Sequence, residues 1–180
     1  MGKRKNTWTD DYVNETIKEI ADERLFILHG EFEQGLKRCE SPLEKVLLAS
    51  MRRYLEMSFH VAIGPTRIAT PVNAVWPEWP SPYHEIIIIP QSQIGNYRAD
   101  FLVGVQSANG NFWIVVECDG HDFHEKTKEQ ARRDRARDRW MQMNGITVLR
   151  FTGSEIYEDP ESCGDQVAEC VLKKWMELPN

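Results

Sequence analysis

Three acidic residues lie in or directly after apolar stretches that favour strands. Glu117 and Asp119 follow the apolar run 113–116, and Asp100 lies inside the apolar stretch 97–105. The β-branched and aromatic residues of these stretches are typical of strands. A carboxylate buried beside a strand is unfavourable unless a cation or hydrogen-bond donors meet it. The three acids therefore predict a site at which negative charge is compensated.

The two stretches are predicted to pair as a hairpin, because Asn109-Gly110 between them is a strong turn signal. A four-residue loop places Asp100 opposite Glu117, and a two-residue loop places Asp100 opposite Asp119. Cross-strand partners share a face, so either loop predicts that all three acids lie on one face. Mg²⁺ prefers carboxylate oxygens and would relieve their repulsion. The alternative is that these acids are solvated strand ends or cap the following helix.

The acids belong to a longer ordered pattern. In chain order it contains Arg98-Ala99-Asp100-Phe101, Val116-Glu117-Cys118-Asp119-Gly120, His124, Asp134-x-x-Arg137 and the apolar run 145–151. This order resembles the PD-(D/E)XK nuclease signature in a variant form, and it is similar to small nuclease-like domains related to very-short-patch repair endonucleases. The resemblance covers residues 97–156 well and residues 41–57 weakly.

The resemblance implies a metal-dependent reaction on a nucleic-acid phosphodiester. Asp100 and Glu117 would hold Mg²⁺ or Mn²⁺, helped by the Cys118 carbonyl and by Asp119. The ion would polarise the scissile phosphate and lower the pKa of a water molecule. The chain departs from the usual motif at one position, since Asp119 stands where the lysine is expected.

Another group must therefore position or deprotonate the attacking water. The resemblance points to His124, whose ordinary pKa of about 6.5 suits proton transfer near neutrality. His121 is closer to the acids in sequence but matches the pattern less well. Lys126 and Lys128 are alternative substitutes for the motif lysine. A role for His124 in capping the following helix also stays open.

Glu44 has two interpretations. Ser41-Pro42-Leu43-Glu44 forms a capping box at the start of a predicted helix that ends near Met57. In the resembled fold, a glutamate on this first core helix points at the metal site, and Glu44 is the matching position. Both roles stay open from the sequence.

A basic helix is predicted over residues 125–144, ending at Gly145. Its candidate nucleic-acid-binding residues are Lys126, Lys128, Arg132, Arg133, Arg135 and Arg139. Acidic residues are interleaved with them, so many of these charges could instead pair one turn away. The excess of basic residues still makes this helix the best phosphate-facing surface of the chain. Asp134 and Arg137 are interpreted as a polar pair that joins the helix to the core.

These segments together predict an α/β fold: a restriction-endonuclease-like mixed β-sheet flanked by helices. Strands over 84–89, 97–105 and 113–119 form an antiparallel meander, the first of them stopped by Pro90. The helix is the crossover to a parallel strand over 146–151. Residues 59–63 are expected to form a short strand, and residues 64–82 a loop.

The chain is predicted to be a single domain with decorations. Residues 1–40 form an N-terminal helical extension, residues 41–156 the PD-(D/E)XK nuclease-like core, and residues 157–180 a C-terminal covering helix. Asp159-Pro160 is predicted to start that last helix. No stretch is long and apolar enough to suggest a membrane span.

Composition limits the classes of partner. With a net charge of −6, the chain as a whole does not attract nucleic acid, so a polyanion must be held by a local basic surface or by metal. The four cysteines show no disulfide-framework spacing, which indicates reduced thiols in a cytoplasmic protein. The oligomeric state stays open, a homodimer included.

The function that these observations favour is a metal-dependent endonuclease acting on DNA, with RNA as an open second substrate. The alternative from another class is a nucleic-acid-binding module of the same fold that has lost turnover, which the missing lysine favours. A zinc site from Cys118, His121 and His124 is a third hypothesis. Strand alternation opposes it, because Cys118 should face away from Glu117.

Overall fold

A computed structural model describes residues 29–59, 66–69, 85–107, 110–119 and 128–178. Five strands form one sheet in the order β1-β2-β3-β4-β5. Their bounds are β1 Thr66–Ile68, β2 Glu85–Ile94, β3 Tyr97–Ser107, β4 Gly110–Asp119 and β5 Thr147–Thr152. The pairs β2–β3 and β3–β4 are antiparallel, and β1–β2 and β4–β5 are parallel. The predicted meander with one parallel strand after a crossover helix is therefore confirmed, and β1 adds a second parallel pair.

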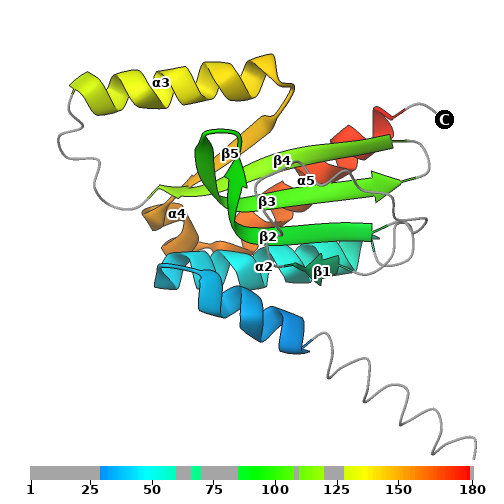
Figure 1. Cartoon of the computed structure of the whole chain (residues 1–180). Coiled ribbons are helices and arrows are strands. Elements are labelled where there is room, and N and C mark those ends of the chain that lie inside the picture. The colour runs from blue at the N-terminus through cyan, green and yellow to red at the C-terminus, as the bar shows by residue number, and fades with distance from the viewer. Residues whose placement is uncertain (1–28, 60–65, 70–84, 108–109, 120–127, 179–180) are drawn as a thin grey trace, which may run out of the picture.

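Helices cover both faces of this sheet (Figure 1). Besides helical residues 29–38, they are α2 Pro42–Phe59, α3 Lys128–Met143, α4 Gly153–Glu158 and α5 Pro160–Met176. α2 and α5 pack on one face, whereas α3 runs along the other. None of the helices in the described ranges is both long and apolar enough to cross a membrane.

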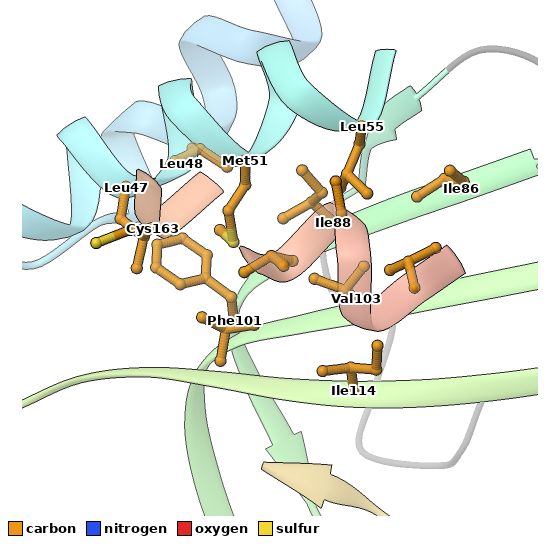
Figure 2. Packing of buried hydrophobic residues seen from close by; sticks show 14 of the residues in the cluster. Leu47, Leu48, Met51, Leu55, Ile86, Ile88, Phe101, Val103, Ile114 and Cys163 are labelled. Atoms are coloured by element: carbon orange, nitrogen blue, oxygen red, sulfur yellow. The ribbon is translucent and has the colours of Figure 1, made fainter. Parts of the chain in front are cut away.

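The core has one cluster on each face of the sheet. The larger cluster joins α2 and α5 to the sheet, with Met51, Ile88 and Phe101 fully buried in it (Figure 2). The smaller cluster includes Leu102 and packs under Met141 of α3. Alternate residues of β3 and β4 thus serve opposite faces, as in a sheet covered on both sides.

Local signals set several helix ends. Gly145 has φ 68°, and the amide of Ile146 donates to the Met141 carbonyl at 2.9 Å, which ends α3 in the predicted left-handed manner. Thr152 and Glu155 form a capping box on α4. Asp159 caps α5, which begins at Pro160 as predicted.

Two element boundaries were predicted wrongly. Pro90 does not stop the first core strand, because β2 continues to Ile94. The β1–β2 register ends at Ile88, so beyond that point Pro90 lies on an edge where no ladder donor is needed. The strand expected at 59–63 is wrong at Phe59, which ends α2, and its residues 60–63 lie outside the described residues. The loop expected at 64–82 is wrong at Thr66–Ile68, which form β1.

The β2–β3 hairpin bends sharply partway along its length (Figure 1). Phe101 packs in the larger cluster and Ala99 in the smaller one, although residues two apart normally share a face. On β2, Ile88 and Ile94 are divided in the same way. The break lies at Gln91, which has φ 54° and falls between the ladder pairs Pro90–Phe101 and Ser92–Ala99. Asp100 occupies the matching position on β3, so both residues stand at the corner of the bend.

Beyond the corner, the hairpin tip packs against α3. The Tyr97 and Trp140 ring centroids lie 5.5 Å apart. Gly95 has φ 57°, and a Cβ atom there would come within 2.8 Å of the Trp140 ring. Glycine therefore permits both the turn and the close approach of the helix. The bend and α3 together enclose the end of β4 that carries the acids.

Candidate active site

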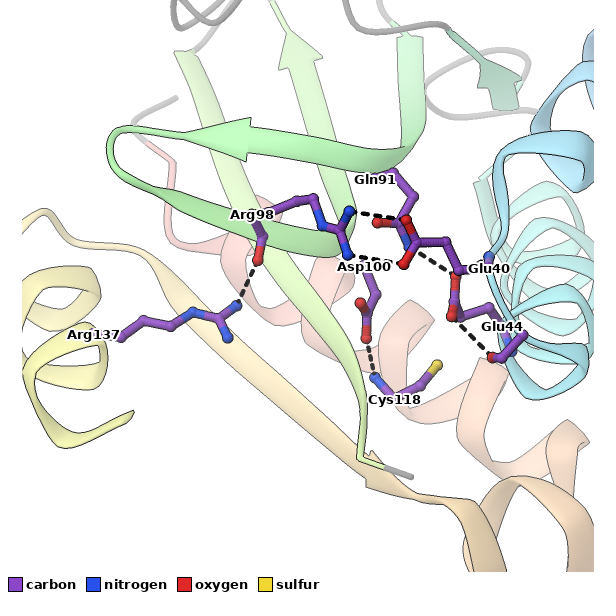
Figure 3. A network of polar contacts seen from close by, with 8 residues as sticks. Glu40, Glu44, Gln91, Arg98, Asp100, Cys118 and Arg137 are labelled. Atoms are coloured by element: carbon purple, nitrogen blue, oxygen red, sulfur yellow. Dashed lines mark hydrogen bonds and ion pairs between the residues drawn. The ribbon is translucent and has the colours of Figure 1, made fainter. Parts of the chain in front are cut away.

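Asp100 occupies the corner of the bent hairpin. One carboxylate oxygen, Oδ2, accepts a hydrogen bond from the Cys118 backbone amide at 2.7 Å (Figure 3). Burial raises the pKa of Asp100, and the Glu44 carboxylate raises it further. The Cys118 amide and the Arg137 guanidinium oppose this increase. Asp100 is thus a partly buried acid that a cation would stabilise.

Glu117 is buried near the end of β4, the strand that pairs with the Asp100-bearing strand β3. Burial raises its pKa to about 7, with a further contribution from the Asp100 carboxylate. The Arg137 guanidinium of α3 acts in the opposite direction, through its charge and a hydrogen bond to Glu117 Oε1. Arg137 Nη2 also donates to the Arg98 carbonyl at 3.3 Å, so Arg137 links α3 to β3 as well as to β4 (Figure 3).

The predicted pairing of the two acid-bearing strands is correct. The side chains of β3, however, do not keep alternating between the two faces through Asp100. Gln106 pairs with Asn111, the register that would place Asp100 opposite Glu117. The regular ladder nevertheless ends at Phe101 and Val116, one position short of the acids. The bend breaks the alternation of β3 there, so a shared face does not follow from parity. The Asp100 carboxylate is nevertheless close enough to Glu117 to raise its pKa electrostatically.

Glu44 is buried at the start of α2 and accepts three hydrogen bonds. The donors are the Glu40 amide at 2.8 Å, Ser41 Oγ at 2.9 Å and Gln91 Nε2 at 2.8 Å. Ser41 Oγ in turn accepts from the Glu44 amide at 3.2 Å, so the helix start is capped. The same carboxylate acts electrostatically on Asp100. Glu44 therefore combines the capping contact with a position beside the acids.

Two residues around the corner had not been predicted as site residues. Gln91 donates to Glu44, and Arg98 makes two hydrogen bonds to the Glu40 carboxylate, each 2.8 Å long (Figure 3). The sequence contained a signal that could have identified Arg98 as a site residue, since it lies two residues before Asp100. The signal for Gln91 was the polar residue directly after Pro90, at the end of an apolar run. Both tie the hairpin to the start of α2.

The thiols near the acids are neutral. Burial and the Asp100 and Glu44 carboxylates raise the pKa of the Cys118 thiol, and similar causes raise that of Cys39 to about 11. Cys118 packs with the larger cluster, on the face away from Arg137, as alternation predicts. The two histidines of the zinc hypothesis lie outside the described residues.

Several predicted site residues lie at the edge of the described structure or outside it. Asp119 ends β4 and pairs with Thr152 of β5. The residues outside are His121, His124 and Lys126, and the side chain of Lys128 is likewise outside. Their predicted roles stay predictions.

The basic helix α3 lies beside the acid site. Arg132, Arg133, Arg135 and Arg139 are exposed on it. One interleaved acid, Asp138, forms an ion pair with Arg150 of β5 rather than with a neighbour on the helix. The acids of α3 therefore do not all neutralise its arginines within the helix.

The donor chemistry at the corner suits a hard divalent cation. No three His, Cys, Asp or Glu side chains are already arranged as a ligand set in the described ranges. Asp100 and Glu117 nevertheless supply carboxylate oxygens, which Mg²⁺ and Mn²⁺ prefer. Burial destabilises the charged form of both carboxylates, and the charge of Asp100 also repels that of Glu117. The binding of a cation would therefore be favourable there. Arg137 now provides part of that positive charge.

Comparison with known proteins agrees with this architecture. Residues 83–171 match the model of a restriction-endonuclease-like family, REase_MTES_1575. The matched segment runs from the start of β2 into α5 and includes Asp100, Glu117 and Arg137. The comparisons with curated proteins and with solved structures found no match. The chain therefore carries a restriction-endonuclease-like domain with the mixed sheet that the sequence predicted.

Proposed function

We propose that this protein is a metal-dependent endonuclease that hydrolyses DNA phosphodiester bonds at the corner formed by Asp100 and Glu117. The observation that carries the proposal is the proximity of the buried Glu117 to the partly buried Asp100, within a segment that matches a restriction-endonuclease-like family. A nuclease-type domain accounts for two carboxylates kept in a costly environment, since perturbed acids concentrate at functional sites.

Asp100 and Glu117 would hold Mg²⁺ or Mn²⁺, with help from the Cys118 carbonyl and Asp119. Such an ion supplies Lewis-acid polarisation of a phosphate and stabilises the charge that develops in hydrolysis. The Cys118 amide orients Asp100 through its bond to Oδ2. Arg137 holds the Glu117 carboxylate in place from α3. His124 is proposed to take the proton of the attacking water, with Lys126 and Lys128 as alternatives.

The exposed arginines of α3 are proposed to bind the DNA backbone. Contacts to phosphate position a nucleic acid without reading its sequence. Because the chain has a net charge of −6, this local basic surface would have to overcome the repulsion of the whole protein. The DNA would then lie over the side of the sheet that α3 covers, next to Glu117.

A nucleic-acid-binding module without turnover is the second candidate. The ion pair between Arg137 and Glu117 favours it, because the protein itself already supplies a cation to that carboxylate. The missing lysine at Asp119 favours it as well. Such a module would bind DNA through α3 and would not need a divalent ion.

Plasmid nicking by the purified full-length protein separates the two candidates. Supercoiled DNA and a labelled RNA of similar length are incubated with Mg²⁺, Mn²⁺ or chelator, and binding is measured in parallel. We expect metal-dependent cleavage that Asp100→Asn and Glu117→Gln each abolish, with folding nearly intact. Glu161→Gln, at an exposed position of α5 far from the acids in sequence, is the matched control and should cleave normally. Activity retained by either site variant would rule out the metal role, and binding without cleavage would favour the module.

A further inference from the structure

Gln91 has the only positive φ of any non-glycine residue in the described ranges. This left-handed conformation costs a non-glycine residue about 1 to 2 kcal/mol. A glutamine gives none of the local compensation that makes asparagine tolerable there. It stands opposite Asp100 at the corner of the bent hairpin, between the ladder pairs on either side. The side chain must therefore contribute something that glycine would not.

Among the described residues, only one of the two polar atoms of the Gln91 side-chain amide makes a hydrogen bond. Nε2 donates to Glu44 Oε2 at 2.8 Å, which fixes the orientation of the amide. Oε1 is buried and has no hydrogen-bond partner in the part of the chain that the structure describes. An unsatisfied buried acceptor costs about 1 to 3 kcal/mol, and such groups are uncommon in native proteins. A donor or a cation is the missing partner.

The nearby donors are already used by other acceptors. The Glu40 amide and Ser41 Oγ donate to Glu44, and the Arg98 guanidinium donates to Glu40. The Cys118 amide donates to Asp100. Figure 3 shows these contacts on the side of the corner that faces α2, where Gln91 and Asp100 both project. The partner of Oε1 therefore has to come from outside this network.

The surroundings select the chemistry of that partner. The Glu44 carboxylate acts electrostatically on Asp100. Gln91 donates to Glu44 and lies across the hairpin from Asp100, between the ladder pairs on either side. The negative charge of these carboxylates makes the binding of a cation beside them favourable. Mg²⁺ and Mn²⁺ accept both carboxylate and amide-carbonyl oxygens. A neutral oxygen also adds a ligand without adding a further negative charge to the cluster.

We propose that Gln91 Oε1 is an oxygen donor to the divalent-cation site that Asp100 anchors. This inference rests on the proposed function and extends it by one ligand that the sequence pattern does not contain. It also gives Glu44 a definite role, since its carboxylate accepts from Nε2 and so fixes the orientation of the Gln91 amide. Glu44 is then a positioning residue that acts through Gln91 and does not itself need to touch the ion.

Mn²⁺ affinity, measured by calorimetry on the full chain without DNA, tests the proposal. Gln91→Met keeps the side-chain length and still places a non-glycine residue at a positive φ, but it removes both polar atoms of the side chain. Gln91→Gly removes the side chain and relieves the backbone at φ 54°. We expect both variants to bind Mn²⁺ about tenfold or more weakly, a loss typical of removing an oriented metal-site contact. The glycine variant should unfold at a higher temperature than the methionine variant, so stability and affinity are separated.

Asp100→Asn is the reference variant in the same titration. If Asp100→Asn loses Mn²⁺ binding while both Gln91 variants bind as tightly as the wild type, Oε1 holds only a structural water and the inference is wrong. The proposed function survives that outcome. If the wild type and Asp100→Asn bind Mn²⁺ alike, the ion site itself is absent, and the proposed function fails together with the inference.

Discussion

Arg137 of α3 and Glu117 of β4 form an ion pair that connects the basic helix to the buried acid at the strand end. The same guanidinium reaches the Arg98 carbonyl on the bent hairpin. α3 is therefore placed by a charge contact at the site as well as by the packing of Trp140 and Met141. A basic surface and an acid pair of opposite sign are thereby held next to each other, as a phosphodiester with a bound cation would require.

The α3 arginines give a prediction on salt dependence. We expect Arg132→Glu/Arg133→Glu to weaken binding to all DNA duplexes alike and to lower the slope of log K against log salt. Each phosphate contact contributes about 0.9 to that slope, so losing two should reduce it by about 2. Both side chains are exposed, which makes a folding defect unexpected. Fluorescence anisotropy over a salt series measures the slope.

The control for this experiment is Lys173→Glu/Lys174→Glu, which makes the same charge change in the last turn of α5. That helix packs on the opposite face of the sheet from α3. Equal weakening by the two double variants would show that net charge, and not the α3 surface, controls binding.

Close packing of α2 on α5 gives a prediction on stability. A Cβ atom on Gly164 would lie 2.7 Å from the Ser50 backbone carbonyl carbon. Gly164→Ala must therefore push the two helices apart, and we expect a loss of about 1 to 3 kcal/mol in the free energy of unfolding. Gly30→Ala is the matched control, because no described atom outside its own helix backbone and chain neighbours lies within 4 Å of its Cβ position. That change should be neutral or stabilising by up to about 1 kcal/mol, measured by urea unfolding.

Much of the sheet could be predicted because its signals are local. The Asn109-Gly110 turn signal predicted the β3–β4 hairpin and left two registers open, and the one that pairs Gln106 with Asn111 is observed. Asp159-Pro160 marked the start of α5, and Gly145 marked the end of α3. Each of these signals operates over a few residues of chain, so sequence alone contains it.

The corner of the site could not be predicted for the opposite reason. A proline after four isoleucines normally ends a strand, and only the short reach of β1 leaves Pro90 on a free edge. The left-handed backbone of Gln91 depends on contacts with α2, which lies 47 positions away in sequence at Glu44. The Arg137 partner on β4 likewise depends on how α3 crosses the sheet. Tertiary packing determined these features.

His124 gives a kinetic prediction that rests on the sequence pattern. Since Asp119 replaces the motif lysine, we expect His124→Ala to slow the cleavage step about a hundredfold or more, with little change in DNA binding. Single-turnover cleavage with Mn²⁺ compares it with His121→Ala and Lys126→Ala. A comparable loss in Lys126→Ala alone would assign the role to that lysine instead.

The raised pKa of Glu117, about 7, gives a prediction on pH-dependent stability. A carboxyl whose pKa is higher in the folded state than its ordinary 4.5 stabilises the fold while it is protonated, and this contribution is lost as the pH rises through about 7. Ionised Glu117 is destabilising on balance because burial outweighs the attraction of Arg137. Glu117→Gln removes the charge and keeps an oxygen for the guanidinium. We therefore expect the variant to gain on the order of 2 kcal/mol over the wild type between pH 5 and pH 8.5.

Urea unfolding in chelator at the two pH values measures this difference. Glu158→Gln, at an exposed position of α4, is the control for loss of one negative charge. If Glu117→Gln differs from the wild type by the same amount at both pH values, Glu117 is already ionised throughout, and Arg137 fully compensates its burial. In that case the corner would have less need of a divalent cation, and the binding module would become the better description of the protein.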